Sequence, residues 1–194
     1  MEHGFAGARE KLTEPLAPIR VDDHTELCPV SVDDCEEIYQ VIERNRARLQ
    51  EWLPWAGLTF NRDELLHFFG QKEIENASRR SLTTHIRFRG KICGAVGLHA
   101  IEPRHRHSSI GYWLDSAYEG QGIMTRACGA MVTTGFESYG LHRIEIRCGT
   151  ANARSAAVAR RLGFVEEGVL REAERVADRW VDLRVFSMLA HHWL

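Results

Sequence analysis

The sequence predicts an α+β fold with a mixed sheet, and three observations support this prediction. The chain has 194 residues, 44% hydrophobic and 27% charged, a balance typical of one globular domain and not of a disordered or coiled-coil chain. Apolar residues recur at helical spacing in some segments and alternate with polar residues in others. The order of these segments, β-α-α-β-β-β-α-β-α-β-β, combines hairpins with crossovers, as layered α+β folds do.

The first residues are set apart from the rest of the chain. Residues 1–17 are predicted to form an N-terminal arm, which ends near Pro15 and Pro18. Residues 18–194 are predicted to form a single domain, because no linker, repeat or low-complexity tract divides them. Its first strand is expected at Glu26–Val30.

Two helices are expected next. Asp33 and Asp34 stand where a helix N-cap belongs, and the helix is predicted to run to about Gln50. The segment Trp52-Leu53-Pro54-Trp55 interrupts it, because proline cannot continue a helix. A second helix is expected at about 62–77, and its apolar residues are Leu65, Leu66, Phe68 and Phe69.

The pattern then changes to a period of two residues. Apolar and polar residues alternate over 82–88, and Arg89-Gly90-Lys91 is expected to form a hairpin turn. Strands at 92–98 and 110–114 complete an antiparallel meander. The remaining elements are a helix with a buried stripe from Met124 to Phe136, a strand at 144–148, a short helix capped by Asn152, and closing strands at 164–175 and 180–189.

Charge and cysteine content exclude several classes of protein. Lys and Arg number 25 against 27 Asp and Glu, so no overall basic charge favours nucleic acid. The basic run Arg104-His105-Arg106-His107 is interpreted as an exposed hairpin tip, with a binding patch as the alternative. No apolar run is long enough to span a bilayer, and the N-terminus lacks a secretory pattern. The odd count of five cysteines favours a reducing, cytoplasmic location.

The segment Gly120-Gln121-Gly122-Ile123-Met124-Thr125 joins a strand to a helix and suits a phosphate group. Glycines allow close approach, and the first turn of a helix presents unpaired N–H groups to an anion. Thr125 replaces the third glycine of the dinucleotide fingerprint, and no lysine follows Gly122 as a P-loop requires. The segment is therefore a phosphate turn of another kind or a plain tight turn.

Several motifs occur together in a characteristic order. They are Ile110-Gly111-Tyr112-Trp113-Leu114-Asp115, the turn just described, Asn152-x-x-Ser155 and Leu162-Gly163-Phe164. In this order they resemble the GNAT acyltransferase superfamily, and more closely its RimJ/RimL-type branch of ribosomal-protein N-terminal acetyltransferases. The resemblance covers about residues 20–192. It implies a mixed, mostly antiparallel central sheet flanked by helices.

The resemblance implies acetyl-CoA as cosubstrate and no metal. Backbone amides of Gln121, Gly122, Ile123, Met124 and Thr125 would hold the pyrophosphate. Trp113 and Leu114 would lie on a bulged strand, where the pantetheine arm pairs with free backbone and one N–H polarises the thioester carbonyl. Glu119 departs from the family pattern, which has Gln or Arg there, and is expected to point away from the pyrophosphate.

Two catalytic residues are implied by the same branch. Ala159 stands where many members carry a tyrosine acid, and Ser155, with Asn152 three residues before it, is expected to take over as a donor to the departing sulfur. Glu174 is the implied base. Each has a plain alternative, because Asn152 and Ser155 suit a helix N-terminus and Glu174 suits a solvated surface.

Aromatic and histidine residues add further candidates. Trp52 and Trp55 could line the acceptor site, with simple core packing as the alternative. Spacing fixes no third ligand beside His105 and His107, so no metal site is predicted.

The predicted enzyme transfers acetyl from acetyl-CoA to a primary amine, namely a protein N-terminal α-amine. An α-amine costs about 1 kcal/mol to deprotonate at pH 7, against about 4.6 kcal/mol for a lysine, so one glutamate base suits it better. A small-molecule amine acetyltransferase and a non-catalytic acyl-CoA-binding module remain alternatives. The expected partners are acetyl-CoA and an amine acceptor such as a ribosomal or other protein N-terminus, without direct nucleic acid or membrane; a homodimer is left open.

Overall fold

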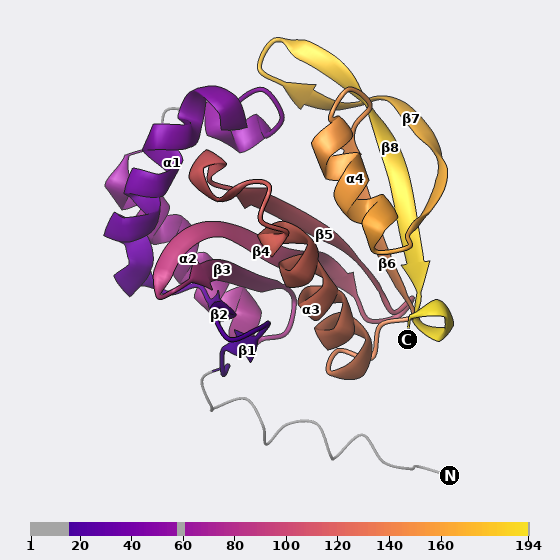
Figure 1. The fold of residues 1–194 in the computed structure, drawn as a ribbon, viewed down its shortest axis with the longest axis horizontal. Helices are drawn as coiled ribbons and strands as arrows, with labels where there is room; N and C mark the ends of the chain where they lie inside the picture. Colours follow the sequence, from indigo (N-terminus) through magenta and orange to yellow (C-terminus); the bar gives the residue numbers. More distant parts are fainter. Residues whose placement is uncertain (1–15, 58–60, 194) are drawn as a thin grey trace.

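The computed structural model describes residues 16–57 and 61–193, and its elements follow the predicted order (Figure 1). The arm predicted for residues 1–17 lies outside the described residues except for its last two. The helices are α1 (Cys35–Leu49), α2 (Arg62–Ala77), α3 (Ile123–Glu137) and α4 (Ala153–Arg161). The strands are β1 (Ile19–Arg20), β2 (Thr25–Pro29), β3 (Leu82–Phe88), β4 (Lys91–Glu102), β5 (His107–Leu114), β6 (Arg143–Gly149), β7 (Val165–Val176) and β8 (Arg179–Leu189).

One sheet of eight strands forms the centre of the molecule, in the order β1-β2-β3-β4-β5-β6-β8-β7. The pair β5–β6 is parallel, and the other neighbouring pairs are antiparallel. The predicted mixed, mostly antiparallel sheet is therefore confirmed. The short strand β1 was not predicted, because two residues carry too little periodicity to be recognised.

The two sides of the sheet are packed by different helices (Figure 1). Helices α3 and α4 bury their apolar stripes in the larger core, together with residues of β2 to β6 and β8; its fully buried members include Ile86, Leu98, Ile123, Met131, Ile144 and Phe186. Helices α1 and α2 form a second, smaller core around Ile38, Val41, Phe69 and Ile92. Of the four apolar residues noted in α2, Leu65 and Phe69 are buried, and Leu66 and Phe68 are exposed.

Strands β5 and β6 pair along only part of their length. Their four residue pairs run from His107↔Arg143 to Ile110↔Ile146. Beyond that point β5 stays on β4 while β6 stays on β8. Residues 111–114 and 147–149 are therefore left without each other as partners, and we call this opening the gap.

The start of α1 lies where it was predicted, after Asp34, but its capping differs. A 3-10 turn over Val32–Asp34 comes first, and Ser31 caps it by accepting from the Asp33 N–H. Asp34 is the N-cap residue of α1 but makes no side-chain cap. Its carboxylate instead bonds to His85 Nδ1 at 3.0 Å and Arg87 Nη2 at 2.6 Å, so it ties α1 to β3.

Candidate functional site

The glycine turn at the start of α3 presents free backbone donors. Gly120 and Gly122 have φ angles of 76° and 72°, a conformation that suits glycine. Gly122 is the N-cap of α3, and the first helical bond runs from the Arg126 N–H to its carbonyl. Among the described residues, no acceptor is bonded to the backbone N–H groups of 121–125. The side chains of Ile123 and Met124 are buried in the core, so only their backbone can face a ligand.

Arginines surround this turn. Arg161, at the end of α4, donates to Thr125 Oγ1 at 3.1 Å, and Arg126 pairs with Asp22 at 2.7 Å. The carboxylate of Glu119 lies between two other arginines: it is bonded to Arg48 Nη1 and accepts from Arg154 Nη1 at 2.8 Å. These two guanidinium groups neutralise the acidic residue that departs from the family pattern.

The gap exposes backbone groups of β5. The Asp115 N–H donates to the Cys93 carbonyl at 2.7 Å, which sets the alternation of the β4–β5 ladder. By that alternation the backbone of Trp113 faces β4, while the backbones of Tyr112 and Leu114 face the gap. Arg48 Nη2 is bonded to the Leu114 carbonyl oxygen, which leaves the Leu114 N–H as a donor toward the gap.

The bulge expected at Trp113 and Leu114 is not found there. Pairing with β4 continues without a register shift from Ser109 to Leu114, and the shift lies at the other end of the ladder, at His99/Glu102. The divergence of β5 from β6 opens the backbone instead. Close packing on the β4 side depends on Gly94, where an added Cβ would lie 2.3 Å from the Trp113 carbonyl oxygen.

Ser155 lies at the junction of the gap and α4. Asn152 caps α4, and its side chain accepts from the Ser155 N–H at 3.0 Å, as the capping alternative predicted. The Ser155 hydroxyl is 2.9 Å from the Tyr112 hydroxyl on β5. On the β6 side, burial raises the pKa of the Cys148 thiol, while a hydrogen bond from Ser155 lowers it. The hydroxyl therefore sits between the two diverging strands.

A cavity of about 290 Å³ adjoins this junction and is predominantly acidic. The β6–α4 turn forms one wall, the β7–β8 hairpin another, and the loop after α1 a third. The cavity has four carboxylates against one guanidinium, and its charged and aromatic lining consists of Glu51, Glu172, Glu174, Asp182, Arg179, Trp52 and Trp180. Arg179 also joins two walls by donating to the Glu51 carbonyl at 2.7 Å.

Glu174 is a partly buried carboxylate in the wall of this cavity. A register shift in the β7–β8 ladder immediately precedes it, where Glu172 has a φ of 47° and donates its N–H to Asp182 Oδ1 at 2.8 Å. No hydrogen bond or ion pair joins the Glu174 carboxylate to another described residue. Burial raises the pKa of Glu174 above its ordinary value, which makes it a stronger base than a solvated glutamate.

The two tryptophans of the loop after α1 are placed differently. Trp52 lines the cavity, and its ring lies 3.6 Å from the position a Cβ on Gly149 would occupy. Trp55 lies in the short helix η2 (Pro54–Gly57), packs on the smaller core and contacts Trp113, with ring centroids 6.2 Å apart. Trp52 and Glu174 therefore line the same cavity, whereas Trp55 packs against Trp113 of β5 at the smaller core.

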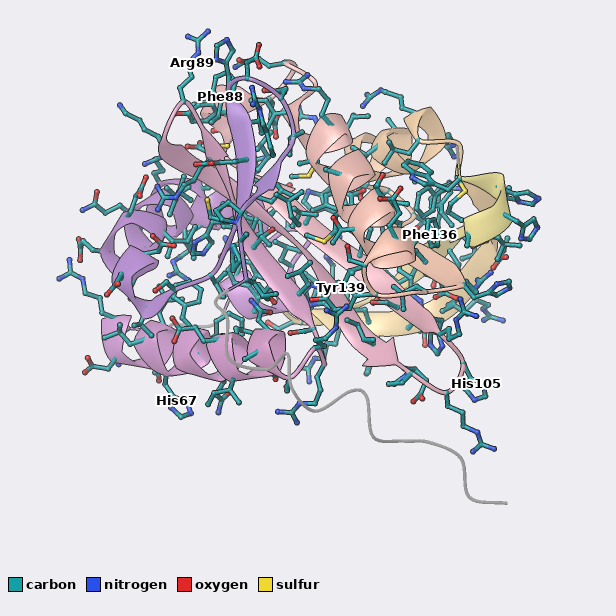
Figure 2. All side chains as sticks on the ribbon, turned by 90° about the horizontal axis from the view of Figure 1, so that it is seen from below. His67, Phe88, Arg89, His105, Phe136 and Tyr139 are labelled. Carbon is teal, nitrogen blue, oxygen red and sulfur yellow. The ribbon has the colours of Figure 1, made fainter. Side chains whose placement is uncertain are left out.

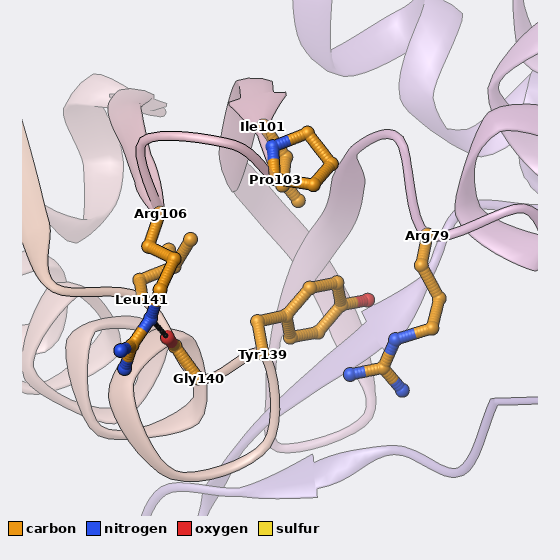
Figure 3. Close-up of a pocket in the computed structure, with 7 residues that line it drawn as sticks. All are labelled: Arg79, Ile101, Pro103, Arg106, Tyr139, Gly140 and Leu141. Carbon is orange, nitrogen blue, oxygen red and sulfur yellow. Dashed lines mark hydrogen bonds between the residues drawn. The ribbon is translucent and has the colours of Figure 1, made fainter. Parts of the chain in front are cut away.

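A second cavity, of about 320 Å³, lies at the paired end of β5 and β6 (Figure 3). Arg106 Nε donates to the Gly140 carbonyl at 2.7 Å, and the Arg79 guanidinium lies 4.1 Å over the Tyr139 ring and bonds the Ser138 carbonyl. Figure 3 shows the two arginines on opposite sides of Tyr139. They hold the chain after α3 and do not converge on a ligand position.

The other candidate ligands lie apart from the gap. His105 is exposed and points away from the body of the protein at the β4–β5 turn, as predicted (Figure 2). Within residues 16–57 and 61–193, no group of three His, Cys, Asp or Glu side chains is placed to hold a metal ion. No helix in the described part of the chain is long and apolar enough to cross a membrane.

The fold thus combines free backbone amides at the start of α3, a gap between β5 and β6, and a partly buried carboxylate in an acidic cavity. The model of the acetyltransferase (GNAT) domain matches residues 24–165, and the chain belongs to this family. The ribosomal-protein-serine acetyltransferase of Escherichia coli is 29% identical over 171 residues, which cover 88% of this chain and 96% of that protein.

Solved structures extend this relationship over most of the chain. RimL, a ribosomal L7/L12 α-N-protein acetyltransferase in complex with coenzyme A, has a TM-score of 0.87 at 27% identity over 91% of this chain and 99% of its own. The microcin C7 self-immunity acetyltransferase MccE, in complex with acetyl-CoA and AMP, has a TM-score of 0.84 at 29% identity over 90% and 98%. The protein is thus an acetyl-CoA-dependent N-acetyltransferase with RimL-type relatives.

Sequence reasoning missed several residues around the site. Tyr112 was seen only as part of a motif, and Trp180 only as the start of a strand. Arg48 and Arg161 gave no signal, because each reaches the site from a helix far away in the sequence. Their roles depend on tertiary contacts that spacing does not encode.

Proposed function

We propose that this enzyme transfers acetyl from acetyl-CoA to a protein N-terminal α-amine, with Glu174 as the base. The observation that carries the proposal is an unpaired, half-buried carboxylate in an acidic cavity beside the gap. A base near neutral pH has to be deprotonated and yet retain affinity for a proton. A raised pKa moves Glu174 in that direction.

The residues around the gap fit acetyl-CoA. The free amides of 121–125 suit a pyrophosphate, with Arg161 beside them, and the unpaired backbone of Tyr112 and Leu114 suits an amide-bearing arm. Bound acetyl-CoA supplies an acetyl thioester, so that a C–N bond forms as the C–S bond breaks and the thiol leaves. We assign the Leu114 N–H to the developing oxyanion and the Ser155 hydroxyl to the departing sulfur.

The cavity suits the amine acceptor. Glu174 receives the proton that the acceptor ammonium loses before attack, and the surrounding carboxylates attract the cationic form. Trp52 and Trp180 offer aromatic walls for the chain that carries the amine. We propose that Trp55 supports the positions of Trp52 and Trp113 and does not contact the acceptor.

The names of the relatives support a protein acceptor, and a ribosomal protein is the first candidate. The acidity of the cavity favours a second candidate, a small polycationic amine, because four carboxylates exceed what a single α-amine needs. We propose a cytoplasmic location, where the five free cysteines remain reduced.

The test is thiol release from acetyl-CoA with a panel of acceptors, combined with mass spectrometry to locate the acetyl group. The panel holds peptides with free and blocked N-termini, lysine peptides, polyamines and amino sugars. We expect acetylation at free N-termini only. Transfer to polyamines alone would replace the protein acceptor with the small-molecule acceptor, and transfer to lysine side chains would contradict the α-amine assignment.

A further inference from the structure

Two hydroxyl groups, from Tyr112 on β5 and Ser155 on α4, lie within hydrogen-bond distance of each other at the gap. Tyr112 lies in the part of β5 that has no partner in β6, and its hydroxyl reaches across to α4. That hydroxyl is 2.9 Å from Ser155 Oγ and 3.0 Å from the Ser155 carbonyl oxygen. The Tyr112 ring is thus held against the residue that we assign to the departing sulfur.

The protons of this pair have two possible arrangements. The Ser155 carbonyl oxygen can only accept, while each hydroxyl can donate once. If Tyr112 donates to the carbonyl, the Ser155 proton can be directed to Tyr112 or to the Cys148 thiol. If Tyr112 donates to Ser155 Oγ, the Ser155 proton cannot return to Tyr112 and is available to the Cys148 thiol or to an acceptor in the gap.

The surroundings keep Tyr112 protonated. Burial raises the pKa of the Tyr112 phenol, the thiol of Cys128 adds to this, and the hydrogen bond with Ser155 and the charge of Arg161 oppose it. The phenol therefore keeps its proton across the neutral range and acts as a hydrogen-bond donor. Helix α4 itself offers no phenol, because Ala159 is a fully buried alanine.

We propose that Tyr112 is a positioning residue for acyl transfer, which donates to Ser155 Oγ and so directs the Ser155 proton at the departing sulfur. The inference rests on the proposed role of Ser155. It gives the side chain of Tyr112 a role of its own, as a hydrogen-bond donor, beside the role proposed above for its backbone. No covalent bond to Tyr112 forms or breaks.

The first test is a double-mutant cycle of Tyr112→Phe and Ser155→Ala in the full chain. Phenylalanine keeps the buried ring and removes one oxygen. We expect Tyr112→Phe to lower kcat about tenfold with the KM for acetyl-CoA unchanged, because a single hydrogen bond is lost in the chemical step. The double variant should be no slower than Ser155→Ala, because Tyr112 acts through Ser155.

A spectroscopic readout separates positioning from packing. The thiol of bound CoA is titrated by its thiolate absorbance, and a donor aimed at the sulfur lowers the thiol pKa. We expect this pKa to rise in both Tyr112→Phe and Ser155→Ala. Tyr139→Phe is the matched control, because it removes a buried hydroxyl without a hydrogen-bond partner, far from the gap, and should leave kcat and the thiol pKa unchanged.

The outcomes separate this inference from the proposed function. If Ser155→Ala keeps full kcat, the proposed role of Ser155 is wrong. If Ser155→Ala is slow but Tyr112→Phe is not, or if the two losses multiply, the inference about Tyr112 is overturned. Should Tyr112→Phe fail to fold, a fluorinated tyrosine at position 112 keeps the hydroxyl as a stronger donor. It should then lower the bound-thiol pKa, and an unchanged or raised pKa overturns the inference.

Discussion

The paired and open halves of the β5–β6 junction differ in how completely their polar groups are satisfied. In the paired half, Arg143 forms ion pairs with Glu145 at 2.7 Å and with Glu167 at 2.5 Å. Arg106 donates a hydrogen bond to the Gly140 carbonyl in the loop after α3. In the open half, Tyr112 and Leu114 have no partner in β6, and Glu174 has no ionic partner among the described residues.

Within one sheet, this difference distinguishes residues that stabilise the fold from residues that are available for binding and catalysis. Satisfied groups are fixed and cannot accept a ligand without losing a partner. Unsatisfied groups lower stability slightly but remain available for binding and proton transfer. Glu167 and Glu174 make the contrast concrete, because both lie on β7 and their pKa values are shifted in opposite directions.

The largest expected effect comes from Glu174→Gln. Loss of the base should lower kcat/KM by about 10²–10⁴-fold and remove the rise in rate that accompanies deprotonation of Glu174. The measurement is a pH–rate profile with acetyl-CoA and a free-N-terminus peptide. Glu167→Gln, on the same strand, is the control and should keep the wild-type profile.

Stability measurements show whether Glu174→Gln is slow because the base is lost or because the fold is destabilised. A raised pKa means that the ionised Glu174 is less favourable in the folded than in the unfolded protein, so glutamine should not destabilise the fold at neutral pH. A slow variant that is also destabilised would speak for a structural role. Equal losses in Glu174→Gln and Glu167→Gln would remove the contrast between the two halves.

The next effect concerns the β4 side of the open half. Gly94→Ala places a methyl group 2.3 Å from the Trp113 carbonyl oxygen, so the two strands must separate. We expect a loss of about 1–3 kcal/mol in the free energy of unfolding, measured with denaturant. Gly70→Ala in α2 meets no atom within 4 Å and should instead stabilise by up to about 1 kcal/mol.

The smallest effect is a pH dependence in the paired half. A hydrogen bond from Arg143, together with one from Ser187, lowers the pKa of Glu167 from 4.5 to about 2. The unfolded chain therefore binds the extra proton in this window, and stability falls as the pH drops from about 4.5 to about 2. Because Glu167 is partly exposed, its share is below about 1 kcal/mol, and Glu167→Gln should flatten the curve by that amount.

Much of the fold was predictable because its signals are local. Alternation marked β3 to β6, the left-handed glycine marked the start of α3, and Asn152 marked α4. Asp34 was correctly placed at the N-cap of α1, but its side chain does not cap the helix, because it bonds instead to His85 and Arg87 on a strand far along the chain. The apolar content of α2 did not show that Leu65 and Phe69 would be buried while Leu66 and Phe68 stay exposed, since composition does not say which side of the helix faces the core.

The site was predictable only in part. The family resemblance indicated Ser155, Glu174 and the amides of 121–125 as site residues. Their roles stay predictions, and so does the homodimer. The expected bulge at Trp113 and Leu114 was wrong because strand divergence opens the backbone instead. Tyr112 could not be found from spacing, because its hydroxyl meets Ser155 across the gap.

Two walls of the acidic cavity come from opposite parts of the chain. Glu51 and Trp52 lie early in the sequence and the β7–β8 hairpin late, whereas the glycine turn, the free strand backbone and the third wall, the β6–α4 turn, lie between them. If the cavity binds the acceptor as proposed, substitutions in Glu51, Trp52 and the hairpin would change the acceptor without altering the residues proposed to face the cosubstrate. The acceptor specificity of such a chain would then be evolvable and open to engineering, while its acetyl donor stays the same.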